Sequence, residues 1–281
     1  MKTAIVTDST AYIPKEIREQ LDIRMVPLSV VIGNDTYKEE TDINATEFYD
    51  KVRNERTLPK TSQPALGDFV STFEELSKNY DAVISIHLSS GISGTLAGAK
   101  QAGEIVDNLN VYTFDSEISC MVQGFYVLKA AQMAKEGAHP EEILQELNTM
   151  KQTIRAYFMV DNLDHLHRGG RLNGIERVIG NVLQVKPILY FENKIIVPFE
   201  KVRTRKKAMK RIADLLQEDA NKYTKLQATI IHASNEQEAI AWKTELEANL
   251  PNVEFTISYF GPVIGTHLGE GSMGLGWVKT N

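Results

Sequence analysis

The chain has 281 residues, of which 42% are hydrophobic and 24% are charged, and its formal net charge at pH 7 is −6. This composition is typical of a globular protein with a full hydrophobic core, and the acidic balance argues against nucleic acid as a partner, because phosphate binding normally needs a broad basic surface. No stretch approaches the 18 apolar residues of a membrane-spanning helix, and Asp8 interrupts the first apolar run too early for a signal peptide, so we expect a cytoplasmic protein.

The first half of the sequence alternates between apolar runs and helix-forming segments. Runs rich in β-branched residues predict strands at residues 3–6, 23–32, 81–86 and 110–114. Pro27 is expected to break the second run into two pieces. Helices are expected after Pro14, from residue 62 onward and over residues 95–106. A further helix is expected after residue 116, with Asp115-Ser116 as its cap. This repetition predicts that residues 1–150 form a parallel-sheet, three-layer α/β/α domain.

Residues 151–281 show a different order of elements. Strands are expected at residues 156–160, 228–232 and 255–260, a hairpin over 188–202 with its turn at 192–194, and helices over 204–220 and 236–249. This order predicts a smaller, two-layer α/β domain with a mixed sheet and helices mostly on one side. We expect the ligand site to lie between the two domains.

The segment SSGISGT at residues 89–95 follows the predicted strand 81–86 and precedes a predicted helix. The unpaired N–H groups at a helix start suit an anion. The segment lacks the lysine of a phosphate-binding P-loop and the last glycine of a nucleophile elbow, because Thr95 stands there. A carboxylate therefore fits this neutral, hydroxyl-lined loop best. The alternative, that Ser93 or Thr95 only caps the helix, stays open.

A second hydroxyl pair, Thr61 and Ser62, also stands just before a predicted helix, whose entry Pro64 fixes. Taken alone, the pair is a helix cap. Two hydroxyl-rich helix starts on neighbouring strands would, however, face one crevice at the carboxyl edge of the sheet. The two segments together therefore favour a ligand site.

The C-terminal segment at residues 261–277 is dense in glycine and contains His267 beside Thr266. Such a segment is expected to form a loop whose backbone either bends sharply or is approached closely by other atoms. Loops of this kind often line clefts. His267 is a candidate for that cleft, with a purely structural hydrogen-bonding role as the alternative.

Seven of the eleven residues at 201–211 are basic, including Arg203 and Arg205, and HRGGR at 167–171 adds Arg168 and Arg171. These segments are either a solvated surface or a docking patch for an acidic partner or a phosphate. No spacing of ligands indicates a metal site. Glu39-Glu40 is interpreted as an exposed charge pair, and Cys120, the only cysteine, as a small buried hydrophobe in a reducing compartment.

Six motifs together resemble the DegV-like fatty acid-binding proteins, in order and nearly from end to end. They are TDST at 7–10, TSQP at 61–64, SSGISGT at 89–95, DS at 115–116, RGGR at 168–171 and GTHLGEGSMG at 265–274. The resemblance implies two α/β domains and one bound long-chain fatty acid, with no cofactor. It also implies that the protein is a carrier rather than an enzyme. A separate fatty acid kinase would phosphorylate the bound acid with ATP, and the acyl phosphate would pass to an acyltransferase of phospholipid synthesis, with at most transient membrane contact.

The resemblance also assigns residues. It implies that Thr61 and Ser93 hold the carboxylate, that His267 lies near the head group, and that Arg203 can pair with this histidine. It makes the RGGR segment the expected place for kinase contacts. Secondary candidates beside these residues are Ser62, Gly94, Thr95 and Thr266 for the ligand, and Arg168, Arg171 and Arg205 for the partner.

Two other functions compete with the carrier. A serine-type hydrolase or acyltransferase would use Ser93 as nucleophile and His267 as base, although no acidic residue can be named to orient the histidine. A nucleic-acid-binding protein would use the basic segment 201–211, against the net charge.

Overall fold

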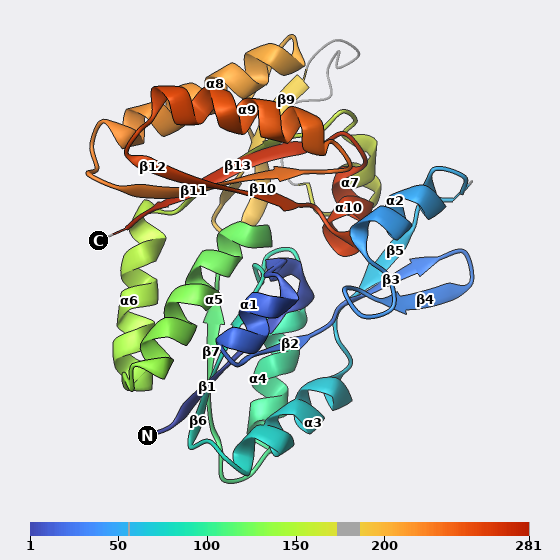
Figure 1. The fold of residues 1–281 in the computed structure, drawn as a ribbon. Helices are drawn as coiled ribbons and strands as arrows, with labels where there is room; N and C mark the ends of the chain where they lie inside the picture. Colours follow the sequence, from blue (N-terminus) through green and yellow to red (C-terminus); the bar gives the residue numbers. More distant parts are fainter. Residues whose placement is uncertain (56, 173–185, 281) are drawn as a thin grey trace.

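The computed structural model describes residues 1–55, 57–172 and 186–280. A four-stranded parallel sheet with the order β2-β1-β6-β7 forms the lower part of the molecule in Figure 1. Its strands are β1 (Thr3–Asp8), β2 (Ile23–Val26), β6 (Ala82–His87) and β7 (Asn110–Asp115). β1 and β6 are buried along their whole length, which explains their continuous apolar, β-branched sequences.

Helices cover both faces of this sheet, which confirms the three-layer prediction. Helices α3 (Leu66–Ser77) and α4 (Thr95–Ile105) cover one face. Helices α5 (Cys120–Lys135) and α6 (Pro140–Thr153) lie on the other, while η1 (Ser9–Ala11) and α1 (Lys15–Gln20) follow β1. The expected cap of α5 is wrong: its N-cap is Ser119, and the Asp115 carboxylate instead accepts hydrogen bonds from the Ser90 backbone and hydroxyl.

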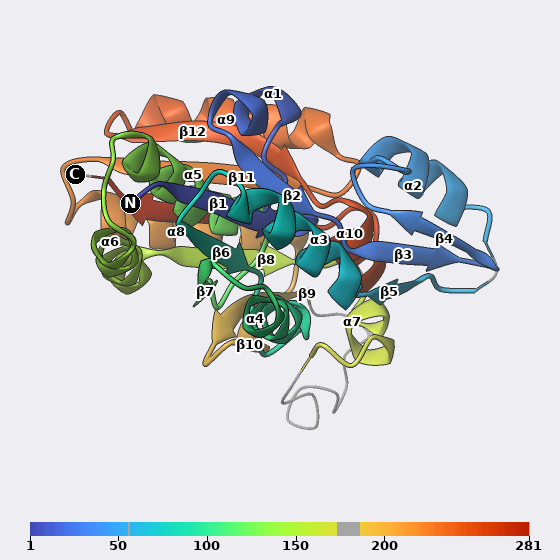
Figure 2. The same ribbon diagram turned by 90° about the horizontal axis from the view of Figure 1, so that it is seen from below.

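A small antiparallel sheet, β4-β3-β5, projects beside the two larger sheets (Figures 1 and 2). It contains β3 (Ser29–Ile32), β4 (Asp35–Lys38) and β5 (Lys60–Ser62), and α2 (Ala45–Val52) lies beside it. Pro27 does divide the second apolar run, and the two pieces join different sheets. Thr61 and Ser62 are not a helix cap as expected, because they belong to β5 and α3 begins only at Leu66 after Ala65.

The second half forms a six-stranded mixed sheet in the order β10-β9-β8-β13-β11-β12. Its strands are β8 (Arg155–Met159), β9 (Lys186–Glu192), β10 (Ile195–Val202), β11 (Leu226–His232), β12 (Val253–Tyr259) and β13 (Met273–Lys279). β9 and β10 form the predicted hairpin. Helices α8 (Arg205–Ala220) and α9 (Glu236–Asn249) cover the outer face in Figure 1, as expected.

The glycine-dense segment 261–277 is not one loop, which corrects the sequence analysis. It contains α10 (Pro262–Leu268) and β13, which pairs with both β8 and β11 inside the sheet. A Cβ at Gly276 would lie 2.3 Å from the Val122 side chain on α5. The glycines of β13 therefore allow a helix to pack directly on the strand, rather than making the backbone bend.

Helix α5 joins the two halves, because it lies between the parallel sheet and the inner face of the six-stranded sheet. One hydrophobic cluster runs from Ile84 of β6 through Phe125 of α5 to Val278 of β13. The predicted domain boundary between residues 150 and 151 falls inside α6, which ends at Thr153. This boundary stays a prediction, because the hydrophobic core is continuous across it.

Glu39 is fully buried, although the sequence analysis interpreted Glu39-Glu40 as exposed. Its carboxyl group accepts hydrogen bonds from the Ser9 hydroxyl (2.5 Å), the Tyr12 hydroxyl (3.0 Å) and the Val263 backbone N–H (2.7 Å). These contacts connect the start of the chain with the first turn of α10.

Candidate ligand-binding site

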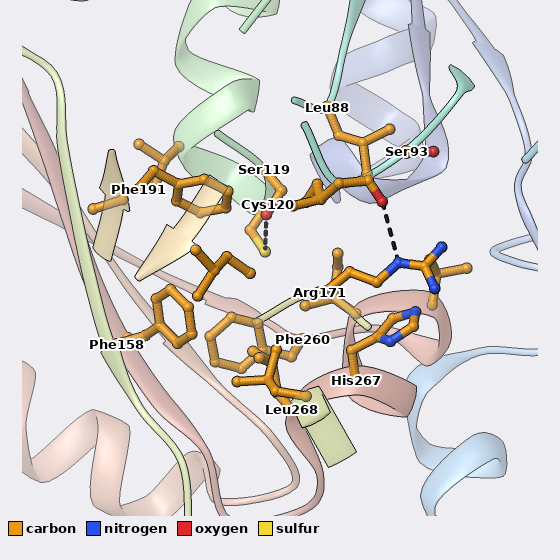
Figure 3. Close-up of a pocket in the computed structure, with 18 of the residues that line it drawn as sticks. Leu88, Ser93, Ser119, Cys120, Phe158, Arg171, Phe191, Phe260, His267 and Leu268 are labelled. Atoms are coloured by element: carbon orange, nitrogen blue, oxygen red, sulfur yellow. Dashed lines mark hydrogen bonds between the residues drawn. The ribbon is translucent and has the colours of Figure 1, made fainter. Parts of the chain in front are cut away.

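A cavity of about 340 Å³ lies between the carboxyl edge of the parallel sheet and the inner face of the six-stranded sheet. Its walls are mainly apolar, and Figure 3 shows many of them. They include Leu88, Val122, Phe158, Phe191, Phe260 and Leu268. A cavity of this size and character is typical of a site for a small apolar ligand with a few polar contacts.

Polar side chains gather at one end of this cavity. Ser93, Arg171 and His267 lie on the side opposite Phe191 and Phe158 in Figure 3, and Thr61 and Ser62 also line the wall. The expected meeting of segments 61–62, 89–94 and 267 is therefore observed. It comes about through β5 and α10 rather than through neighbouring helix starts. The cavity is thus apolar along most of its length and polar at one end.

The loop after β6 is fixed by the turn of the β9–β10 hairpin. The Ser89 hydroxyl donates a 2.6 Å hydrogen bond to the Lys194 carbonyl oxygen, and a Cβ at Gly91 would lie only 2.3 Å from that oxygen. Ser93 and Gly94 line the cavity, whereas Thr95 is buried in the first turn of α4. The Ser93 hydroxyl oxygen accepts a 3.3 Å hydrogen bond from the Thr95 N–H. The N-cap of α4 is Gly94, so Ser93 lies one residue before the cap and lines the cavity.

His267 lies in the last turn of α10, where its Nε2 is 2.9 Å from the Thr61 hydroxyl oxygen. Burial, together with the charge of Arg171, lowers the pKa of His267 to about 4. The imidazole is therefore neutral near pH 7. Its Nδ1 has no hydrogen-bond partner among the described residues. A Cβ at Gly169 would lie only 2.4 Å from this nitrogen, so the glycine of the RGGR segment leaves room for the ring. Thr266 instead bonds the Pro262 carbonyl oxygen and does not line the cavity.

Arg171 supplies the positive charge of this polar end. It follows α7 (Asp164–Arg168), and its guanidinium donates to the Ile92 carbonyl (3.2 Å) and the Gly169 carbonyl (2.6 Å). Arg171 is predicted to contact a partner, but the structure places it in the cavity wall. The signal that was overlooked is the pair of glycines before it, which permits the tight turn that brings the side chain inward.

Arg203 does not reach the cavity. It is exposed at the end of β10, it is absent from the cavity wall, and no contact with His267 connects it to the polar end within the described part of the chain. Arg205 is held by Glu238 and Asp161 on the outer surface. Arg168 lines a surface depression that also contains Lys60 and His165. This depression shares Thr61, Arg171 and His267 with the polar end of the cavity, and we call it the mouth.

The described residues contain no group of His, Cys, Asp and Glu side chains that could hold a metal ion. Within the same ranges no helix has the length and apolar character needed to cross a bilayer. Cys120 is buried in the cavity wall, as expected of a small hydrophobe, and burial raises the pKa of its thiol to about 12.

A Ser–His–Asp arrangement that the sequence analysis missed lies within the parallel sheet. His87 Nδ1 is 2.9 Å from the Asp8 carboxylate, and His87 Nε2 is 2.6 Å from the Ser85 hydroxyl oxygen. All three side chains are fully buried, and none lines the cavity. The only signal of this arrangement in the sequence is the spacing of Ser85 and His87. They stand two residues apart on one strand, so their side chains lie on the same face of the sheet.

Known proteins match this chain over its whole length. The family model described as "DegV: Uncharacterised protein, DegV family" matches residues 2–280. Protein DegV of Bacillus subtilis (strain 168) is 59% identical over 278 residues, which cover 99% of each protein. The crystal structure of DegV, a fatty acid binding protein from Bacillus subtilis, has a TM-score of 0.95 and 58% identity over all of both chains.

A more distant structure has the same fold. A DegV family protein from Thermus thermophilus, described for its fatty acid binding, has a TM-score of 0.93 and 31% identity, again over 100% of both chains. Both matches cover the whole chain, and with it all three sheets and the segments that form the cavity. The chain therefore belongs to the DegV family.

Proposed function

We propose that this protein binds one long-chain fatty acid, with the tail in the apolar cavity and the carboxylate at the polar end formed by Thr61, Ser93, Arg171 and His267. The observation that carries this proposal is a cavity with mainly apolar walls and one polar end. The fatty acid-binding description of the Bacillus subtilis structure, at 58% identity, supports it.

The physical chemistry of the cavity suits such a ligand. Burying about 15 methylene groups gains roughly 12 kcal/mol at about 0.8 kcal/mol each. Association and ordering costs remove a large share of this gain, which leaves micromolar or tighter binding. A buried carboxylate needs hydrogen-bond donors in place of water, and the Arg171 guanidinium and the hydroxyl groups are such donors. The tail therefore supplies most of the affinity, and the head group sets the orientation.

The expected test is mass spectrometry of protein that is purified gently and then denatured in organic solvent. Wild-type protein is expected to release one fatty acid per chain. Ser93→Ala and Thr61→Ala are each expected to lower fatty acid affinity about tenfold, because each removes a donor to a charged oxygen. Ser71→Ala, which changes an exposed serine of α3, is the matched control.

Two results would contradict this assignment. Wild-type protein that stays without lipid after incubation with a panel of fatty acids would refute the proposed function. Full retention by both single variants and the double variant would refute the assignment of the two hydroxyl groups alone.

We further propose that the protein is a carrier that presents the fatty acid to a separate fatty acid kinase, whose acyl phosphate product serves an acyltransferase of phospholipid synthesis. The basic mouth beside the polar end, with Lys60 and Arg168, supports this proposal because it suits an acidic partner surface near the carboxylate. Arg203 and Arg205 lie elsewhere on the surface.

The mouth can be tested apart from the cavity. The double variant Lys60→Glu/Arg168→Glu is expected to retain its fatty acid, whereas the rate of acyl phosphate formation with ATP and a bacterial fatty acid kinase falls at least tenfold. Charge reversal at a steered interface slows association, and raised salt should reduce the difference. Arg203→Glu is the control for general loss of positive charge. An unchanged rate in the double variant, or an equal loss in the control, would refute docking at the mouth.

The geometry does not favour the serine hydrolase. The Ser93 hydroxyl is paired with the Thr95 hydroxyl at 2.9 Å, while His267 Nε2 is paired with Thr61. A nucleophile and its base must share a hydrogen bond, and a third group should orient the base. Labelling of Ser93 by a fluorophosphonate probe would revive this alternative.

A further inference from the structure

A second pocket adjoins the apolar end of the cavity. It has a volume of about 320 Å³ and shares Ala156, Tyr157 and Phe191 with the cavity wall. Phe191 lies at the end opposite Arg171 and His267 in Figure 3. The cavity and this pocket, which we call the distal pocket, therefore meet at the shared residues, at the end where a fatty acid tail would finish.

The distal pocket contains a buried hydroxyl group without a partner. Tyr126 of α5 is fully buried, lines the pocket and packs on Phe114 with 5.2 Å between ring centroids. Its hydroxyl group has no hydrogen-bond partner among the described residues. Burial, and to a lesser extent the charge of Glu117, another lining residue, raise the pKa of Tyr126, so its hydroxyl group keeps its proton and stays a donor. A buried hydroxyl group with no partner is unfavourable, and native proteins usually provide one.

The other polar groups of the distal pocket are mainly donors. Lys151 is paired with Glu117, and Lys194 with Asp115, both at 3.0 Å. Arg155 donates from Nη1 to two backbone carbonyl groups. Lys151, Arg155 and Lys194 thus line the distal pocket together with the Glu117 carboxylate, and the unpartnered Tyr126 hydroxyl adds another donor. The pocket favours an acceptor oxygen over a methyl group.

We propose that the distal pocket receives the far end of an acyl chain that carries an oxygen there, as a hydroxyl or carboxylate group, and that Tyr126 donates a hydrogen bond to it. This inference rests on the proposed function, because the carboxylate at Ser93 and Arg171 fixes the direction of the tail. A tail of matching length places its last carbon past Phe191. A tail that stops short stays within apolar walls, so the effect depends on chain length.

The test compares saturated fatty acids of 14, 16 and 18 carbons with their terminal hydroxy and dicarboxylic counterparts, by competition binding to delipidated full-length protein. In a closed apolar cavity, a terminal hydroxyl group would weaken binding about 10- to 100-fold at every length. For this protein we expect at least one chain length at which the affinity of the terminal hydroxy acid is within threefold of that of its parent acid.

Tyr126→Phe is expected to weaken binding of that hydroxy acid about tenfold and to change binding of the parent acid less than twofold. Tyr190→Phe is the matched control, because this tyrosine lines the same pocket but its hydroxyl is bonded to Glu192 at 2.6 Å. A uniform penalty at all three lengths, or equal effects of Tyr126→Phe on both ligands, would overturn the inference. Failure of the parent acids to bind would refute the proposed function instead.

Discussion

Raising the pH from 5 to 9 is expected to lower the free energy of unfolding of this protein by several kcal/mol, and Glu39→Gln is expected to remove most of that loss. Burial raises the pKa of Glu39 to about 8, although hydrogen bonds from Ser9, Val263 and Tyr12 partly oppose the rise. The folded protein therefore favours the protonated carboxyl group at neutral pH. The unfolded chain, with its carboxyl group in water, loses that proton near pH 4.5.

The sign follows from proton linkage. Because the folded pKa lies above the unfolded one, the favourable contribution is fully present below about pH 4.5 and is lost as the pH rises through 8. The difference between the two pKa values corresponds to about 5 kcal/mol. Glu40 changes stability in the same direction, since burial also raises its pKa, so Glu39→Gln should leave a small residual slope.

Urea unfolding at pH 5, 7 and 9 tests this prediction. Glutamine keeps the acceptor oxygen for Val263 and Tyr12 and can donate to Ser9, so the variant should fold. Its stability is expected to exceed that of the wild type at pH 9. Glu74→Gln, at an exposed position of α3, is the control. Equal pH slopes in wild type and Glu39→Gln would refute the buried titration.

Local sequence signals predicted the regular part of this fold. The continuous apolar run before HLSSGISGT required a buried parallel strand, and β6 is buried throughout. The turn at 192–194 indicated a hairpin, and Asn193 and Lys194 have the positive φ values that such a turn needs. These features depend on neighbouring residues, so one sequence is enough to reveal them.

Features that depend on distant residues were missed. The glycines of β13 were interpreted as loop residues, because only the packing of Val122 on the strand explains them. Glu39 is predicted to be exposed, because its partners Ser9 and Val263 are far away along the chain. Arg171 was assigned to a partner surface, since only the fold shows that its turn faces the loop at Ile92. In each case the tertiary contact, rather than local preference, decides the environment.

The same limitation applies to Asp8, whose replacement by alanine is expected to lower the free energy of unfolding by about 3–5 kcal/mol. Asp8 ends β1, is fully buried, and accepts five hydrogen bonds. The donors are the Thr10 N–H and hydroxyl, His87 Nδ1, the Leu88 N–H and the Gln123 side-chain amide. Alanine would leave these donors buried without their acceptor.

The Asp8 network also decides between a structural and a catalytic role for the Ser85–His87–Asp8 arrangement. Ser85 is fully buried and does not line the cavity, so Ser85→Ala is expected to leave fatty acid binding unchanged and to cost less stability than Asp8→Ala. Asp8→Ala should weaken fatty acid retention as well, because Leu88, held by Asp8, forms part of the cavity wall. Urea unfolding and lipid retention are the measurements, with the exposed Asp107→Ala as control. A loss below about 1 kcal/mol in Asp8→Ala would contradict the structural role, since removal of a buried, multiply bonded carboxylate must cost more than that.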